Sequence, residues 1–202
     1  LVANNWFKFQ SQWTYNAYQT LKDLDKYLIL IFLIQKTFKH YSDMFLVISE
    51  DTLYNQKSFE IEKINLIEIS EELKIAKETV RRKINELNKD GLLERSGKRI
   101  IVNTEAFAKQ RPIKTVKYLS SFLSTISKVV SDQNSQIIST HIPALEIETF
   151  IRDNFSLIWK FYFRTQIPNL VDWRKYYGDL ESWAVAGTVL TNQMHKIRDK
   201  YK

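Results

Sequence analysis

The segment KETVRRKINELNKDGLL combines an apolar stripe at helical spacing with a row of positive charge. Val80, Ile84 and Leu87 fall at i, i+4 and i+7, so one side of a helix over 77–89 would pack inward. Gly91 favours an end to this helix, because glycine adopts the left-handed backbone conformation at little cost. The segment therefore predicts an amphipathic helix with a sharp stop.

Short elements are expected on both sides of this helix. The run INLIEI over 64–69 alternates apolar and polar residues and favours a short strand, followed by a short helix over 71–74. The run LLERSGKRIIVN has two apolar parts around a Ser-Gly-Lys turn, which is typical of a β-hairpin. In this order the elements predict a winged helix-turn-helix over 62–104.

Positive charge gathers where this fold would expose it. At 100° per residue, the side of helix 77–89 opposite the apolar stripe carries Glu78, Arg82, Asn85 and Lys89, flanked by Arg81. Such a helix fits the major groove of DNA, where Arg and Lys read guanine and Glu accepts from cytosine. The hairpin adds Arg95, Lys98 and Arg99, placed to contact phosphates or the minor groove. Phosphates would relieve the repulsion within the row Arg81, Arg82 and Lys83.

The stretch EISEELKIAKETVRRKINELNKDGLLERSGKRIIVN resembles the winged-helix domains of bacterial transcription regulators, particularly the catabolite activator protein type. In that type Arg-Glu-Thr-Val-x-Arg opens the recognition helix, and here the corresponding residues are Lys-Glu-Thr-Val-Arg-Arg. The resemblance implies that Lys77, Glu78 and Arg82 read base edges and that Thr79 contacts a phosphate. The predicted DNA-binding residues are Lys77, Glu78, Thr79, Arg81, Arg82, Asn85, Arg95, Lys98 and Arg99.

Two positions depart from the pattern of that family. Lys74 stands where the family has glycine, and a positive φ there would cost roughly 1 kcal/mol. Ala76 stands where Ser or Pro starts the recognition helix, so the usual capping hydrogen bond is missing.

Long helices are expected elsewhere, because only 4 glycines and 3 prolines interrupt 202 residues. Helical spacing predicts one helix over 17–41, with the stripe Ala17, Leu21, Leu24, Leu28 and Ile31, and a further helix within 43–60. Other helices are expected over 113–134, 144–166 and 179–200, with connections at 133–135, 167–168 and 178–179. The fold class is mainly α, with an N-terminal helical region (1–61), the winged helix-turn-helix (62–104) and a C-terminal helical region (105–202) for dimerisation or sensing.

The apolar surface of the helices over 17–41 and 144–166 exceeds what a small winged helix can cover, so a symmetric homodimer through them is expected. Dimers of this kind contact two half-sites about 34 Å apart. Aromatic residues are frequent in the C-terminal half and suggest a core and a subunit interface. A pocket lined by them could also bind a small-molecule effector, although no sequence feature identifies one.

A membrane span is not expected. The most apolar run, YLILIFLI, covers roughly 12 Å as a helix, against a hydrocarbon core about 30 Å thick. Charged residues flank it, so it predicts a helix buried on nearly every side. Cysteine is absent, and no secretory signal is visible, which favours a cytoplasmic protein. The net charge of +7 favours a polyanionic partner.

Catalytic, cofactor and metal sites are not predicted, because His40, His141 and His195 lie far apart and no catalytic motif is present. The expected function is sequence-specific binding of double-stranded DNA by a homodimeric transcriptional regulator. One alternative is a non-catalytic winged-helix module that binds protein in a chromosome-organising or replication assembly. Another is a plasmid-type replication initiator, although such proteins usually carry two winged helices and this sequence predicts one.

Overall fold

The protein is mainly helical and carries a small β-sheet, as the sequence predicts. The computed structural model describes residues 2–55, 58–61, 65–96, 99–103, 113–133 and 140–200. Its elements in chain order are α1 (Val2–Leu21), α2 (Leu24–Asp43), α3 (Glu50–Asn55), β1 (Ser58–Ile61), α4 (Leu66–Leu73), α5 (Lys77–Lys89), β2 (Leu93–Ser96), β3 (Arg99–Asn103), α7 (Ile113–Gln133), α8 (Ala144–Asp153), α9 (Phe155–Tyr177) and α10 (Leu180–Lys200).

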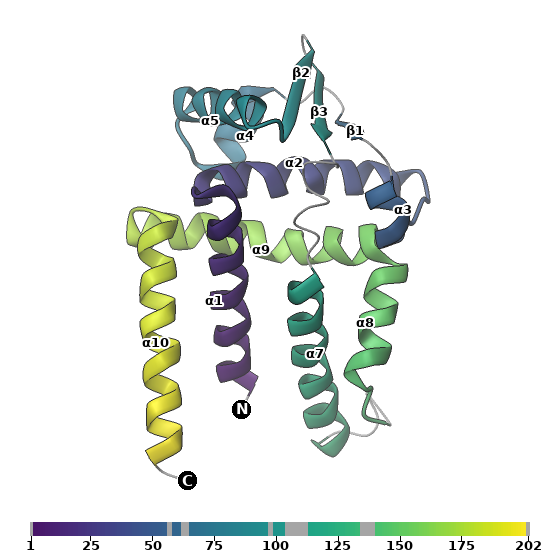
Figure 1. The fold of residues 1–202 in the computed structure, drawn as a ribbon, viewed down its shortest axis with the longest axis vertical. Helices are drawn as coiled ribbons and strands as arrows, with labels where there is room; N and C mark the ends of the chain where they lie inside the picture. Colours follow the sequence, from purple (N-terminus) through teal and green to yellow (C-terminus); the bar gives the residue numbers. More distant parts are fainter. Residues whose placement is uncertain are drawn as a thin grey trace.

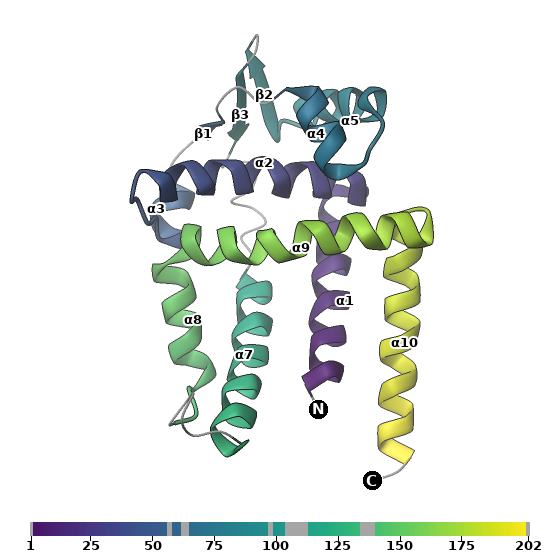
Figure 2. The same ribbon diagram turned by 180° about the vertical axis from the view of Figure 1, so that it is seen from behind.

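Two long helices, α2 and α9, lie side by side across the middle of the molecule (Figure 1). The helix-turn-helix and its sheet lie on the outer side of α2. Helices α1, α7, α8 and α10 extend from the central pair in the opposite direction, and the view from behind shows the same arrangement (Figure 2). The central pair therefore separates the winged helix from the remaining helices.

The predicted single helix over 17–41 is wrong, because the helix is interrupted between α1 and α2. Lys22 has a φ of 54°, and Asp23 is extended with a φ of −164°. The Asp23 carboxylate accepts a hydrogen bond of 2.9 Å from the backbone N–H of Lys26 and so caps α2. The predicted apolar stripe is buried, but two helices share it. Since the helical period continues across the break, the only local signal was the capping aspartate.

Helix α2 is buried on nearly every side, as its apolar run predicts. From Leu28 to Leu33 no residue is more than 3% exposed. This helix packs against α9 on one side and against α4, α5 and β1 on the other. Within the described ranges, no helix is long and apolar enough to cross a membrane.

Much of the apolar surface that suggested a dimer interface is therefore covered within one chain, although Leu145, Phe150 and Phe161 on α8 and α9 are each more than half exposed. On α8 and α9, Ile151, Phe155, Trp159 and Phe163 are likewise at most 6% exposed. Trp13, Trp159 and Tyr162 interlock in this core, and the ring centroids of Trp13 and Tyr162 are 4.7 Å apart. These aromatic residues form the core, while Tyr176, which is 80% exposed, lies outside it.

The β-sheet has three strands in the order β1-β3-β2, all antiparallel. The predicted hairpin is confirmed as β2 and β3, in which Leu93 pairs with Val102. Its third strand, β1, begins at Ser58 and was not predicted. The helix expected within 43–60 is found in part, as the short helix α3. The predicted strand over 64–69 is wrong, since α4 begins at Leu66, and the start of that segment lies outside the described residues.

The C-terminal half differs from the prediction at two connections. The helix expected over 144–166 is two helices, α8 and α9, which meet at Asn154. Pro168, expected in a connection, lies inside α9. Ile167 and Leu170 are buried on either side of it, so tertiary packing holds the helix where proline alone would favour a break. Helices α7 and α10 and the turn at Gly178, with a φ of 86°, confirm the expectations there. The connection expected at 133–135 lies outside the described residues, except for Gln133, which ends α7.

Candidate nucleic-acid interface

The turn between α4 and α5 forms despite its unusual residues. Lys74 adopts the left-handed conformation, with φ 54° and ψ 36°, so this lysine takes the positive φ at the position where the family has glycine. Ser70 stabilises the turn, because its hydroxyl donates a hydrogen bond of 2.6 Å to the carbonyl of Ile75. Ala76 caps α5 without a side-chain hydrogen bond. The helix-turn-helix geometry therefore does not depend on glycine or on a capping serine.

Helix α5 divides into a buried side and an exposed side. Val80, Ile84 and Leu87 are at most 1% exposed and pack into the core, as predicted. The opposite side is open to solvent and carries Lys77, Glu78, Arg81, Arg82, Asn85 and Lys89, with Thr79 half-buried at its edge. This side also has an open hollow of about 390 Å³. Its lining residues are Glu78, Thr79, Arg81, Arg82, Asn85, Glu86 and Lys89.

The basic row at 81–83 is not a single surface. Arg81 and Arg82 are exposed, but Lys83 is only 8% exposed and forms an ion pair with Asp23. Lys83 lies three residues after Val80 and four before Leu87, so helical geometry places it on the inward side. Phosphates are therefore not needed to relieve repulsion at Lys83, because a carboxylate of the same chain already does so.

Ion pairs fix the helix-turn-helix to α2. Lys26 of α2 contacts Asp90 at 2.9 Å and Glu86 at 3.4 Å, beside the pair between Lys83 and Asp23. Burial alone would lower the pKa of Lys26, but its hydrogen bonds and the charges of the two carboxylates outweigh this effect and raise it. Further along α2, Lys36 contacts Glu68 of α4 at 2.7 Å. The sequence shows that charged residues flank the apolar run, but it does not show which residues they pair with, because the partners are remote in sequence.

The exposed arginines of α5 each contact a carboxylate on the same helix. Arg81 pairs with Glu78, and Arg82 pairs with Glu86 at 2.9 Å. The hydrogen bond from Arg81 lowers the pKa of Glu78, and the same contact raises the pKa of Arg81. Pairs between exposed side chains stabilise proteins little because water and salt screen them. Both guanidinium groups can therefore exchange these partners for those of a ligand at low cost.

The wing lies beside α5 (Figure 1). Arg95 is exposed on β2, whereas Lys98 lies outside the described residues. For Arg99 the described structure gives the strand but not the side chain. The predicted site therefore comes together in part, as an exposed α5 surface with Arg95 on the neighbouring hairpin.

The fold and this surface define a winged helix-turn-helix protein. Residues 60–105 match the family model of the DeoR-like helix-turn-helix domain, which supports a DNA-binding transcription regulator. This match covers less than a quarter of the 202 residues, and the particular resemblance to the catabolite activator type stays a prediction. No curated protein and no solved structure matches the chain significantly. In the part of the chain that the structure describes, no cluster of His, Asp and Glu could hold a metal ion.

Proposed function

We propose that the protein is a transcription regulator that binds double-stranded DNA sequence-specifically through the exposed side of α5. The observation that carries this proposal is the division of α5: its apolar side and Lys83 are fixed against α2, while Arg81 and Arg82 face solvent. A helix held this rigidly can enter the major groove without reordering its backbone.

The proposed residue roles are those that the family resemblance and the predicted wing imply, and the exposure of the α5 residues supports them. Lys77, Glu78 and Arg82 would contact base edges, and Arg81, Asn85 and Thr79 would hold the helix in the groove or contact phosphates. Arg95, Lys98 and Arg99 of the wing would bind the phosphate backbone. Binding would require Arg82 to leave Glu86, and the loss of one exposed ion pair costs at most about 1 kcal/mol.

A homodimer would let two α5 helices contact two half-sites about 34 Å apart. Since α2 is covered within the chain, the second copy would use another surface. Helix α10 supports this proposal, because Val185, Val189, Leu190 and Ile197 are each more than half exposed along it. Light scattering that gives a monomer mass at high protein concentration would contradict the dimer.

DNA binding can be measured by fluorescence anisotropy with duplexes selected from a random library. On the selected site, Arg82→Ala should cost about 1–3 kcal/mol and relax the base preference at one position. Lys98→Ala should weaken all sequences alike and reduce the salt slope by about 1. Arg164→Ala, an exposed arginine on α9, is the matched control and should change neither quantity. If the wild-type protein shows no salt-sensitive binding to duplex DNA, the proposal is wrong and a protein-binding module is favoured.

A further inference from the structure

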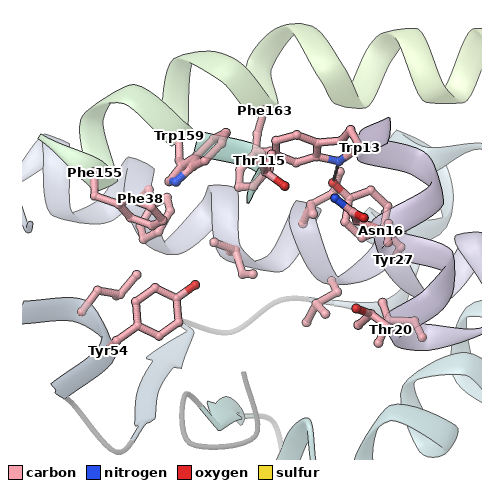
Figure 3. A pocket seen from close by; sticks show the side chains of 16 residues that line it. Trp13, Asn16, Thr20, Tyr27, Phe38, Tyr54, Thr115, Phe155, Trp159 and Phe163 are labelled. Carbon is pink, nitrogen blue, oxygen red and sulfur yellow. Dashed lines mark hydrogen bonds between the residues drawn. The ribbon is translucent and has the colours of Figure 1, made fainter. Parts of the chain in front are cut away.

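A pocket of about 160 Å³ lies where α1, α2, α3, α7 and α9 meet (Figure 3). Its walls are mainly aliphatic and aromatic side chains, among them Trp13, Ile31, Phe155 and Trp159. An engineered apolar cavity of about 150 Å³ holds a benzene molecule. The pocket is therefore large enough for a molecule built on one aromatic ring.

The chemistry of the described walls favours an uncharged ligand. The described residues that line the pocket include no Asp, Glu, Lys, Arg or His. Burial raises the pKa of Tyr27 well above its ordinary value, and the nearby Tyr162 raises it further against the hydrogen bond from Trp13. This phenol consequently stays neutral. An ion entering the pocket would lose its hydration without gaining a counter-charge from these described residues.

One polar group at the pocket is left without a hydrogen bond. The indole Nε1 of Trp159 is buried, and among the described residues it has no hydrogen-bond partner. The nitrogen lies near Phe155 and Phe38 at one end of the pocket (Figure 3). Contacts with Phe155 and Phe163, at centroid distances of 5.4 Å and 5.8 Å, fix the orientation of the indole ring. An unpaired buried N–H is unfavourable, and a ligand whose acceptor atom displaces part of the wall at this end of the pocket would satisfy it.

Helix α2 contacts both the pocket and the helix-turn-helix that carries the proposed DNA-binding surface. Leu30, Ile31, Ile34 and Phe38 of this helix form one wall of the pocket. The same helix holds α5 through its ion pairs with Lys83, Glu86 and Asp90 and holds α4 through Lys36. A ligand that shifts α2 relative to α9 would therefore move the whole helix-turn-helix.

We infer that this pocket binds a small, uncharged aromatic molecule with one hydrogen-bond acceptor, which pairs with Trp159 Nε1 and changes DNA affinity through α2. The part that concerns DNA rests on the proposed function, whereas ligand binding does not. The binding site is the first step of the test, and the coupling to DNA is the second.

Binding can be followed without DNA by the indole N–H signals in ¹H–¹⁵N NMR spectra, with Trp159→Phe used to assign the Trp159 signal. Three probes separate the chemistry: acetophenone has a ring and a carbonyl acceptor, ethylbenzene lacks the acceptor, and benzoate is charged. We expect acetophenone to bind and to shift the Trp159 signal downfield, ethylbenzene to bind more weakly, and benzoate not to bind. Absence of acetophenone binding, or binding that leaves the Trp159 signal unmoved, would overturn the site.

Two variants distinguish a specific site from a loose core. Trp159→Phe should weaken acetophenone about fivefold, the equivalent of one neutral hydrogen bond, and leave ethylbenzene within about twofold. Ala17→Leu adds volume to the pocket wall on α1 with a residue that favours helices, and should abolish binding of both probes. Equal losses for the two probes in Trp159→Phe would overturn the role of the N–H group. Circular dichroism checks that both variants fold.

The DNA step uses anisotropy titrations with and without saturating acetophenone. A change in duplex affinity of about fivefold or more would support regulation through α2, in the range typical of allosteric coupling. Unchanged affinity in a protein that binds both DNA and acetophenone would refute the coupling. If acetophenone binds but duplex DNA does not, the proposed function fails, the regulatory part fails with it, and the ligand site stands on the NMR result.

Discussion

Replacing Lys83 by methionine should destabilise the fold without weakening DNA binding, although Lys83 belongs to the basic row at 81–83. Its side chain is 11% exposed, and that of its partner Asp23 is 21% exposed. Loss of one member of a fully buried pair costs about 3–5 kcal/mol, because the other charge is left without its partner. Asp23 keeps some solvent and its capping bond to Lys26, so we expect a smaller loss, about 2–3 kcal/mol.

Urea unfolding followed by far-ultraviolet circular dichroism measures this loss as a lower midpoint at constant slope. In a protein of this size, about 2–3 kcal/mol corresponds to a decrease in Tm of about 4–12 °C. Lys89→Met, at the exposed end of the same helix, is the control and should stay within about 0.5 kcal/mol of wild type. The salt slope of DNA binding should be unchanged in Lys83→Met. Wild-type stability together with a reduced salt slope would refute the assignment and return Lys83 to the DNA-binding surface.

Three further outcomes are expected. Lys74→Gly should stabilise the protein by about 0.5–1 kcal/mol in urea unfolding, because glycine adopts the left-handed turn without strain; destabilisation would argue against that turn. Leu87→Ala should cost about 2–5 kcal/mol, since this fully buried side chain joins α5 to the core; a loss below that range would mean that the site collapses around the cavity. Arg81→Met should raise the pKa of Glu78 toward its ordinary value in a carboxyl ¹³C NMR titration, because the lowered pKa comes first from the hydrogen bond with Arg81. An unchanged Glu78 pKa in this variant would contradict the pairing with Arg81. Because the pKa of Glu78 is lowered in the folded state, the pairing stabilises the fold above the pKa of the unfolded state, and this stabilisation is lost as the pH falls through the folded-state pKa.

The sequence by itself determined the winged helix. The spacing of Val80, Ile84 and Leu87 decided which side of α5 is buried, and Gly91, with a φ of 73°, decided where the chain turns into the hairpin. The same local pattern correctly predicted which α5 side chains face solvent. These features depend on neighbours within a few residues, so a single sequence contains them.

Only the tertiary structure decided what each buried or charged group meets. The apolar run of α2 predicted burial but not its partners, which are α9 on one side and the winged helix on the other. Part of the surface that suggested a dimer is therefore covered within the chain. The pairing of Lys83 with Asp23 joins residues on different helices, and the pocket beside Trp159 takes walls from five helices. Helical periodicity fixes the direction of a side chain, whereas its partner depends on how distant segments pack, which no local pattern encodes.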